Sequence, residues 1–345
     1  MMMPARGAWL SRTSLTAVLA ATLAVAGASL PAAAAQAAAG RPQISGSQPA
    51  GRAWPSFACD PALDELVLFG GDNGRTVFGG TWIYQDGAWI QEHPALSPAP
   101  RTGAALVYDA ATGQLLLFGG SSKIGTAGGF FGDTWTWTGT TWQQLHPATS
   151  PPARHNADMI YDAAGQDVVL FGGYDGHYLG DTWTWNGSTW TQQDTPAAPA
   201  PRDTGSFAYD TATGTGILYG GFNGVTAFTD TWTWNGSTWT KLTTTASPGR
   251  VTAGWQMAGD DAAGQVLLFG GGRYNHTNSG ATWAWNGTTW TRLHPAASPY
   301  GRGAGSMTYD SATQQIVLSG GQGYHQDTYP AATWAWDGTT WQKLT

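Results

Sequence analysis

The sequence repeats one unit of about 50 residues six times. In each copy an apolar run ends in a Gly-Gly pair, a Thr-Trp pair follows, and a second Trp stands seven residues after the first. The Gly-Gly pairs begin at Gly70, Gly119, Gly172, Gly220, Gly270 and Gly320. The second tryptophans are Trp89, Trp142, Trp190, Trp239, Trp290 and Trp341. Such self-similarity restricts the chain to an array of equivalent structural units.

Each unit predicts four short antiparallel strands. In the second unit the strand sequences are GAALVYD, QLLLFGG, DTWTWTG and TTWQQLH, and they lie between residues 103 and 146. They are rich in β-branched and aromatic residues and are separated by Gly-containing turns. Asn-Gly steps at Asn186, Asn235 and Asn286 stand between alternating aromatic residues, which predicts two-residue hairpins. A single sheet of this kind leaves its faces uncovered, so the units are expected to pack radially as the blades of a propeller.

The repeat pattern resembles the kelch family. Every unit has an Arg, a strand, an apolar run ending in Gly-Gly, a Trp-x-Trp or equivalent segment and a lone Trp, and a four-stranded period near 50 residues is typical of kelch propellers. The resemblance covers residues 52–345 and implies an all-β, six-bladed kelch-type propeller. The expected blades span residues 52–97, 98–149, 150–198, 199–246, 247–298 and 299–345.

The N-terminal segment has the features of a secretory signal peptide. Arg6 and Arg12 precede an apolar run at residues 15–30, and small residues follow it. We expect a signal peptide at residues 1–39, cleaved at about 33–39, then a short linker at 40–51. The Ala-rich composition is typical of bacterial signals, so a secreted, extracellular protein without stable membrane insertion is expected.

The overall charge limits the class of partner. The formal net charge is −7 and the pI is about 5.3, which argues against nucleic acid because phosphate contacts need a basic surface. A single cysteine excludes an intramolecular disulfide framework. The non-repeat histidines show no metal-ligand spacing, so we expect neither a metal nor a cofactor.

Antiparallel topology places two kinds of connection on opposite faces of the disc. The turns between first and second strands are nearly identical in all units, whereas the loops between second and third strands vary. Binding residues concentrate in variable loops on a rigid scaffold, so we place the ligand site on this variable-loop face. The candidates there are Arg75, Tyr174, Asp175, His177, Tyr178, Arg273, Tyr274, His276, Tyr324 and His325. Packing of the loops against themselves is the alternative.

Two tryptophans stand outside the repeat positions and are further ligand candidates. Trp54 and Trp255 lie at the starts of first strands, where other units have Gly, Ala, Asn or Thr. We expect both rings to be partly exposed at the channel mouth.

An arginine precedes the first strand of every unit. The series is Arg52, Arg101, Arg154, Arg202, Arg250 and Arg302. These residues either form a cationic funnel for an anionic ligand such as an acidic sugar, or bind neighbouring carbonyl groups as part of the repeat.

Catalytic candidates are few. Asp158 is the only acid in a series that includes Ser56, Ala105, Ser206 and Ser306, with Gln256 expected in the fifth blade. Together with His155 and His177 it is a candidate for proton transfer; the alternative is that Asp158 pairs with Arg154 or a serine.

Copper-radical chemistry is not expected. Galactose oxidase, which contains kelch-like repeats, needs a Tyr–Cys crosslink. The only cysteine here, Cys59, takes the position of a strand tyrosine and is interpreted as a buried strand residue.

These observations favour a secreted, monomeric binding module that recognises a glycan or a protein through the variable-loop face. A carbohydrate-active enzyme, such as a lyase, epimerase or hydrolase, is the second hypothesis. A structural cell-surface protein is the third.

Overall fold

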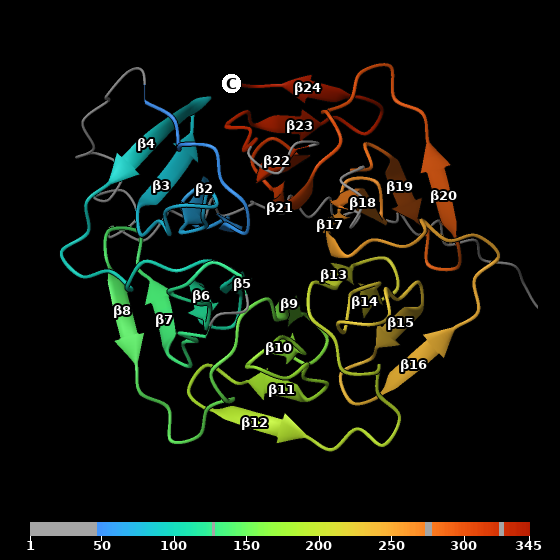
Figure 1. Cartoon of the computed structure of the whole chain (residues 1–345), viewed down its shortest axis with the longest axis horizontal. Coiled ribbons are helices and arrows are strands. Elements are labelled where there is room, and N and C mark those ends of the chain that lie inside the picture. Colours follow the sequence, from blue (N-terminus) through green and yellow to red (C-terminus); the bar gives the residue numbers. More distant parts are fainter. Residues whose placement is uncertain (1–46, 126–127, 273–277, 324–327) are drawn as a thin grey trace, which may run out of the picture.

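The chain folds as a six-bladed β-propeller. A computed structural model describes residues 47–125, 128–272, 278–323 and 328–345, and these residues form 24 strands joined by loops and turns. Figure 1 shows six four-stranded sheets arranged around a central axis. Within these ranges no helix has the length and apolar character needed to cross a membrane. The predicted all-β propeller with four antiparallel strands per blade is confirmed; the expected signal peptide lies outside the described residues.

Each blade is built from four strands that are consecutive in the sequence. Blades 1 to 3 consist of β1 (Ser56–Asp60), β2 (Glu65–Phe69), β3 (Thr81–Gln85), β4 (Ala88–Glu92), β5 (Ala105–Asp109), β6 (Gln114–Phe118), β7 (Thr134–Trp137), β8 (Trp142–Leu145), β9 (Asp158–Asp162), β10 (Asp167–Phe171), β11 (Thr182–Trp185) and β12 (Trp190–Gln193). Blades 4 to 6 consist of β13 (Ser206–Asp210), β14 (Thr215–Tyr219), β15 (Thr231–Trp234), β16 (Trp239–Leu242), β17 (Ala253–Asp260), β18 (Gln265–Gly272), β19 (Thr282–Trp285), β20 (Trp290–Leu293), β21 (Gly303–Asp310), β22 (Gln315–Gln322), β23 (Trp334–Trp336) and β24 (Trp341–Lys343).

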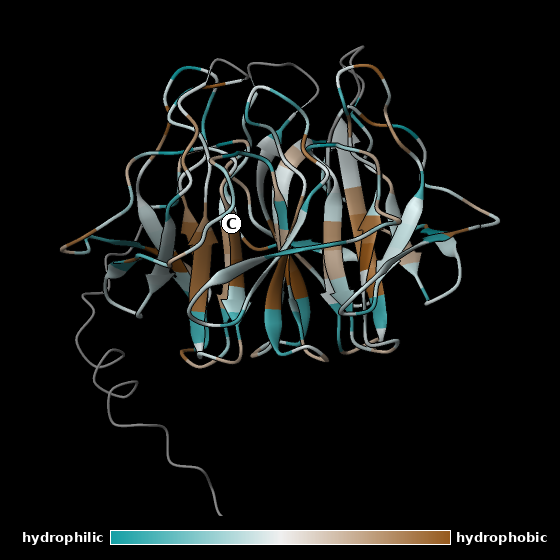
Figure 2. Ribbon diagram, turned by 90° about the horizontal axis from the view of Figure 1, so that it is seen from below, coloured by the Kyte–Doolittle hydropathy of each residue, from teal (hydrophilic) through white to brown (hydrophobic). Residues whose placement is uncertain are grey.

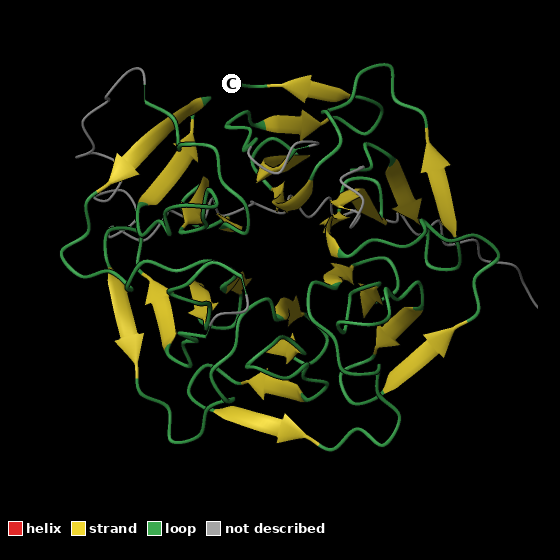
Figure 3. Ribbon diagram, in the orientation of Figure 1, coloured by secondary structure: helices red, strands yellow, loops and turns green. Residues whose placement is uncertain are grey.

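The strand order runs from the axis to the rim in every blade. In Figure 3 the innermost strands surround the central opening, and the outermost strands, among them β4 and β24, lie at the circumference. Neighbouring strands pair antiparallel; in blade 1, for example, Ser56 lies opposite Phe69 and Asp60 opposite Glu65. No described blade combines strands from both ends of the chain.

Aromatic side chains fill the space between adjacent blades. Trp142 of blade 2 packs against Phe69 of blade 1, with ring centroids 5.2 Å apart, and against Trp137 of its own blade at 5.3 Å. The Trp142 indole also donates a hydrogen bond to Thr81 Oγ1 of blade 1. The lone Trp of the fourth strand therefore serves the scaffold, since tryptophan combines a large apolar area with one donor that needs a partner.

The Gly-Gly pairs are required by backbone geometry. Gly70 and Gly71 have φ values of 68° and 87°, and a Cβ atom on Gly70 would collide with the carbonyl oxygen of Arg101 in the next blade. The close approach lets the Gly71 amide donate to that same carbonyl at 2.9 Å. The repeated Gly-Gly thus marks where one blade joins the next.

The two faces of the disc differ as the topology predicts. Figure 2 shows short turns at one face and longer loops at the other. The short turns are closed locally; in blade 2, Asp109 Oδ1 accepts a hydrogen bond from the Ala111 amide. The longer connections, between second and third strands and between blades, lie at the opposite, variable-loop face.

Candidate functional site

A central channel runs between the six innermost strands, β1, β5, β9, β13, β17 and β21. At the middle of the channel, six apolar side chains border two cavities, one above them and one below. These residues are Phe57, Leu106, Met159, Phe207, Met257 and Met307. The cavity toward the variable-loop face has a volume of about 170 Å³, and the cavity toward the short turns about 440 Å³. The channel is thus divided by an apolar waist into an upper and a lower chamber.

The lower chamber is lined mainly by strand aromatic and aliphatic residues. Tyr108, Tyr161, Tyr209 and Tyr309 line it, and Cys59 occupies the equivalent position in blade 1. Burial is the main cause that raises the pKa of the Cys59 thiol to about 11, and Ser311 is its hydrogen-bonding neighbour. The interpretation of Cys59 as a buried strand residue is confirmed.

The mouth of the upper chamber is formed by residues in left-handed backbone conformation. They are Trp54, Gly103, Asn156, Thr204, Gly254 and Ala304, with φ between 24° and 65°. Trp54 donates its amide to the Ala304 carbonyl at 2.7 Å, and Gly103 donates to the Trp54 carbonyl at 3.0 Å. Asn156 and Thr204 continue the series at 2.8 and 3.4 Å. These bonds fasten neighbouring blades together where a ligand would enter.

Below the mouth lies the series of residues that includes Asp158. All its members line the upper chamber: Ser56, Ala105, Asp158, Ser206, Gln256 and Ser306. Two of the serines bind blade backbone, since Ser56 donates to the Ala104 carbonyl and Ser206 to the Trp255 carbonyl, each at 2.8 Å. The position predicted for Gln256 in the shifted fifth blade is correct.

Asp158 is a partly exposed carboxylate that has no hydrogen-bond or ion-pair partner among the described residues. The expected pairing with Arg154 is wrong, because Arg154 binds Asp181 at 2.6 Å. Burial, with a smaller contribution from the nearby charge of Asp203, raises the pKa of Asp158 to about 8, while Arg202 acts in the opposite direction. A cationic group next to Asp158 would therefore stabilise its charged form and lower its pKa.

The predicted proton-transfer cluster does not form. His155 is buried between the rings of Phe130 and Tyr174, at centroid distances of 5.2 and 5.7 Å, and burial lowers its pKa to about 4. The His177 side chain is 93% exposed and lies 3.7 Å from Asp175 in its own loop. Because one imidazole is enclosed and the other is in solvent, the two histidines do not converge on Asp158. In the described ranges no three His, Cys, Asp or Glu side chains are grouped to hold a metal ion.

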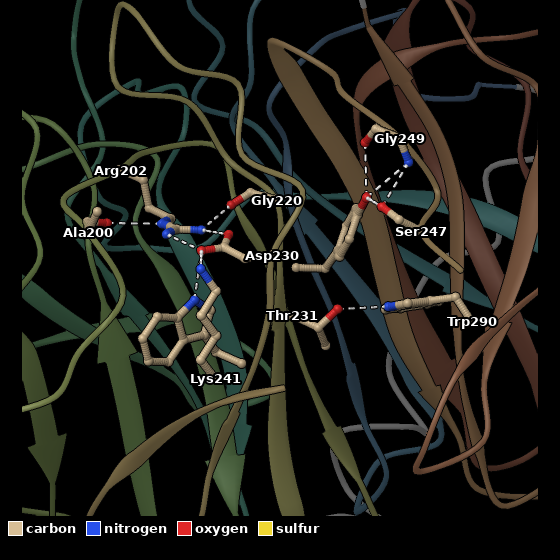
Figure 4. A network of polar contacts seen from close by, with 11 residues as sticks. Ala200, Arg202, Gly220, Asp230, Thr231, Lys241, Ser247, Gly249 and Trp290 are labelled. Carbon is tan, nitrogen blue, oxygen red and sulfur yellow. Dashed lines mark hydrogen bonds and ion pairs between the residues drawn. The ribbon is translucent and has the colours of Figure 1, made fainter. Parts of the chain in front are cut away.

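Five of the six repeat arginines are structural. Arg52, Arg101, Arg154, Arg202 and Arg302 are at most 3% exposed. Figure 4 shows the pattern at Arg202, which donates to the carbonyls of Ala200 and Gly220 and pairs with Asp230. A phenylalanine covers three of these guanidinium groups; the Phe228 centroid, for example, lies 3.9 Å from Arg202. The alternative of carbonyl binding is thus confirmed for these five, and a cationic funnel is not formed.

The sequence of the chain matches a family model over most of this repeat array. Residues 34–196 and 85–271 match the KLHDC2/KLHL20/DRC7 Kelch-repeats domain. The chain belongs to the kelch-repeat family. The Arg, Gly-Gly and Trp positions that carried the resemblance are the residues that join the blades of this kelch propeller.

In the fifth blade of the kelch propeller the repeat arginine is not buried, because Arg250 is exposed. Here the preceding blade supplies the anchor instead: the Tyr219 hydroxyl lies 2.7 Å from Ser247 Oγ, accepts the Gly249 amide at 2.9 Å and donates to the Gly249 carbonyl at 3.0 Å (Figure 4). In blades 1, 2, 3 and 5 the residue at the position of Tyr219 is Phe. The hydroxyl thus compensates for the arginine displaced by the longer connection.

The two non-repeat tryptophans differ from each other. Trp54 is partly exposed and lines the upper chamber, as expected. Trp255 is only 5% exposed and packs in the core with Tyr219 and Val251, so the expected exposure of its ring is wrong. The longer connection of blade 5 brings Val251 onto this tryptophan and covers it.

The variable loops of blades 2 to 4 present a continuous row of rings, which we call the aromatic row. It consists of Phe130, His155, Tyr174, Tyr178 and Phe222. Tyr174 contacts Phe130 at 5.9 Å and Tyr178 at 5.0 Å, and Tyr178 contacts Phe222 at 6.3 Å. Apart from the buried His155, all members are partly exposed. Two of the predicted ligand residues, Tyr174 and Tyr178, therefore stand at the centre of a larger surface.

Sequence reasoning missed Phe222 as part of this surface. The signal was present, because Phe222 directly follows a Gly-Gly pair, as Tyr174 does in the blade before it. Both residues also form equivalent bridges, with Asp203 and His155 respectively.

The remaining predicted ligand residues are not members of the aromatic row. Arg75 is exposed in the loop of blade 1, which contributes no ring to the aromatic row. Asp175 is partly exposed beside Tyr174. Arg273, Tyr274, His276, Tyr324 and His325 lie outside the described residues.

Proposed function

We propose that this kelch propeller is a protein-interaction module that binds a basic segment of a partner across blades 2 to 4. The aromatic row is the observation that carries the proposal. Apart from the buried His155, its rings come from three separate loops, yet they contact one another edge to face and remain partly exposed. Aromatic side chains arranged in this way are typical anchors of protein interfaces.

The charges beside the row favour a cationic partner. Asp158, Asp175 and Asp203 lie on blades 3 and 4, and Asp203 forms a bridge with Phe222 of the row. Burial raises the pKa of Asp203 to about 6, as it also raises the pKa of Asp158. A cation bound beside them would stabilise the ionised form of both carboxyl groups. An arginine side chain suits this surface, because it stacks on aromatic faces and pairs with carboxylates. The net charge of −7 attracts such a segment at long range.

This geometry favours a binding module over a carbohydrate-active enzyme. The three catalytic candidates do not converge, and the only unpaired acid among them, Asp158, stands next to structural serines. A glycan ligand remains the competing occupant of the aromatic row and is an outcome of the experiment below.

The experiment selects ligands from a display library of random twelve-residue peptides on the immobilised full chain. We expect enrichment of Arg or Lys next to an aromatic or aliphatic residue. A selected peptide should lose at least about tenfold in affinity with Tyr174→Ala or Asp158→Asn, equivalent to about 1.4 kcal/mol. Tyr300→Ala is the matched control, because Tyr300 is 89% exposed and lies outside the row.

The proposal is wrong if the enriched peptides are acidic or if Tyr174→Ala leaves their binding unchanged. A glycan array read with the same variants tests the other ligand class. Sugar binding that Tyr174→Ala abolishes, without any enriched peptide, would assign the row to a glycan.

We also propose that the protein is exported. The support is the basic, apolar and small-residue order of residues 1–39. Mass spectrometry of the secreted protein should find a mature N-terminus between about residues 33 and 40; an intact Met1 on the bulk of the cellular protein would contradict export.

A further inference from the structure

In three blades an internal carboxylate completes the environment of the buried arginine. Asp133 accepts hydrogen bonds from Arg101 Nη1 and Nη2 at 2.6 and 2.9 Å, and from Trp135 Nε1 at 2.7 Å. Blades 3 and 4 repeat this arrangement with Asp181 and Asp230. Burial alone would raise the pKa of these acids, but the arginine and tryptophan donors lower it. The donor set is therefore built for one carboxylate.

Blade 1 keeps the donors and lacks the carboxylate. Gly80 stands where blades 2 to 4 have Asp, whereas Arg52 and Trp82 are retained. Arg52 is 3% exposed and makes the repeat's usual bonds, from Nε to the Ala50 carbonyl and from Nη1 to the Gly70 carbonyl, both at 2.8 Å. Within the described part of the chain, Arg52 Nη2 and Trp82 Nε1 have no hydrogen-bond partner. Burial lowers the pKa of Arg52 to about 10, as expected for a guanidinium without a counter-charge.

The space at Gly80 points toward these donors. A Cβ atom on Gly80 would lie 3.2 Å from Trp82 Nε1 and 3.6 Å from Gln91 Nε2. Gly80 does not have a positive φ, so an aspartate fits its backbone without strain. A side chain at this position would thus be directed at two nitrogen donors, and the third donor is the buried Arg52.

Blade 6 repeats the substitution. Ala332 replaces the aspartate, Arg302 is 2% exposed, and the buried Trp334 Nε1 has no hydrogen-bond partner in the described residues. Blade 5 also lacks the acid, with Ala281 at this position, but its arginine, Arg250, is exposed and does not complete the donor set. Blades 1 and 6, which meet at the closure of the ring, therefore combine the missing acid with a buried arginine.

We propose that Arg52, Trp82 and Gln91 form a binding site for a carboxylate supplied from outside the chain, and that Arg302 and Trp334 form a second one. The ligand class is a carboxylate, because the equivalent donors in blades 2 to 4 hold the planar, two-oxygen group of Asp in a bidentate fork. Small free carboxylates and the side chain of an acidic peptide offer the same chemistry.

The test measures thermal unfolding of the full chain in sodium acetate against sodium chloride at equal ionic strength. Acetate should raise the unfolding midpoint by about 2–4 °C for each kcal/mol of binding free energy. The double variant Gly80→Asp/Ala332→Asp should unfold at a higher temperature than the parent and lose the response to acetate.

A matched variant recreates the vacancy elsewhere. Asp181→Ala in blade 3 should lower the unfolding midpoint, and acetate should restore part of the loss. If acetate rescues Asp181→Ala but has no effect on the parent protein, the sites in blades 1 and 6 are closed and the proposal is wrong.

Nuclear magnetic resonance gives a direct readout that does not depend on stability. On addition of acetate, the indole N–H signal removed by Trp82→Phe should shift in the parent spectrum. A capped Gly-Asp-Gly peptide replacing acetate distinguishes the two sources: a shift with acetate alone restricts the site to small carboxylates, and a shift with both admits peptide side chains. No shift with either ligand overturns the proposal.

Discussion

Trp89 of the first blade donates its indole N–H to Thr333 Oγ1 of the last blade at 2.9 Å. The same Trp–Thr bond joins every other pair of neighbouring blades, for example Trp290 to Thr231 at 3.0 Å (Figure 4). The closure of the ring therefore uses the ordinary contact of the repeat. No strand shared between the two ends of the chain is needed.

Removing the acceptor of this bond should weaken closure. Thr333→Val preserves shape but leaves the buried Trp89 indole without a partner, so we expect a loss of about 1–3 kcal/mol in the free energy of unfolding. Urea denaturation measures it. Thr191→Val, on the exposed face of β12, is the control and should change stability by less than about 0.5 kcal/mol. Equal effects of the two substitutions would show that the bond is not important for closure.

The sequence predicted the fold well because the repeat residues make equivalent contacts in each blade. Gly70 and Trp142 are constrained by contacts with the adjacent blade, and such constraints recur at a fixed period. Periodicity alone therefore located the strands, the two faces and the structural arginines.

Departures from the period were harder to interpret. Trp255 resembles Trp54 in the sequence because both stand outside the repeat, and both border the upper chamber. Val251, in the connection before β17, packs on Trp255 and leaves it only 5% exposed, whereas Trp54 stays partly exposed. The aromatic row was also only partly predicted, because contacts such as Tyr178 with Phe222 join different blades and have no sequence spacing. Both depend on how neighbouring loops pack, which one chain without aligned relatives does not reveal.

The Tyr219 hydroxyl provides a test of the irregular fifth connection. Tyr219→Phe restores the residue that most blades have, but it removes the bonds to Ser247 and Gly249. We therefore expect a loss of about 0.5–1.5 kcal/mol in the free energy of unfolding, because the hydrogen bonds between the Tyr219 hydroxyl and the half-buried Gly249 are lost. Hydrogen exchange should also become faster in residues 247–252. Unchanged protection there would mean that the loop is held by other contacts.

Ala304 allows the strain of the channel mouth to be measured. Its φ is 57°, a conformation that costs a non-glycine residue about 1–2 kcal/mol, and its side chain is 1% exposed. Ala304→Gly relieves this strain but increases the freedom of the unfolded chain, so we expect a net gain of about 0.5–1 kcal/mol in urea denaturation. Ala335 is equally buried within β23 and has an ordinary φ, so Ala335→Gly should destabilise the protein. A loss from both substitutions would argue that the mouth is unstrained.

Asp158 should make the stability of the protein depend on pH near neutrality. Its pKa is about 8 in the folded chain, raised by burial and by Asp203, but near 4 in the unfolded chain. Between these values the folded state holds the extra proton, so the free energy of unfolding falls as pH rises. Below about pH 6.5 the buried His155 opposes this trend, because its lowered pKa makes stability rise with pH. Burial also raises the pKa values of Asp60, Asp167 and Asp203 to about 6, so these groups act in the same direction as Asp158 up to about pH 7. The window from about pH 7 to 8 therefore reports mainly on Asp158. There we expect the parent protein to lose stability by at most about 1.4 kcal/mol per pH unit, and Asp158→Asn to show a nearly flat profile in urea denaturation. Parallel profiles for the two proteins would show that the Asp158 carboxyl is well solvated, and would remove the reason to expect a cationic side chain in the upper chamber.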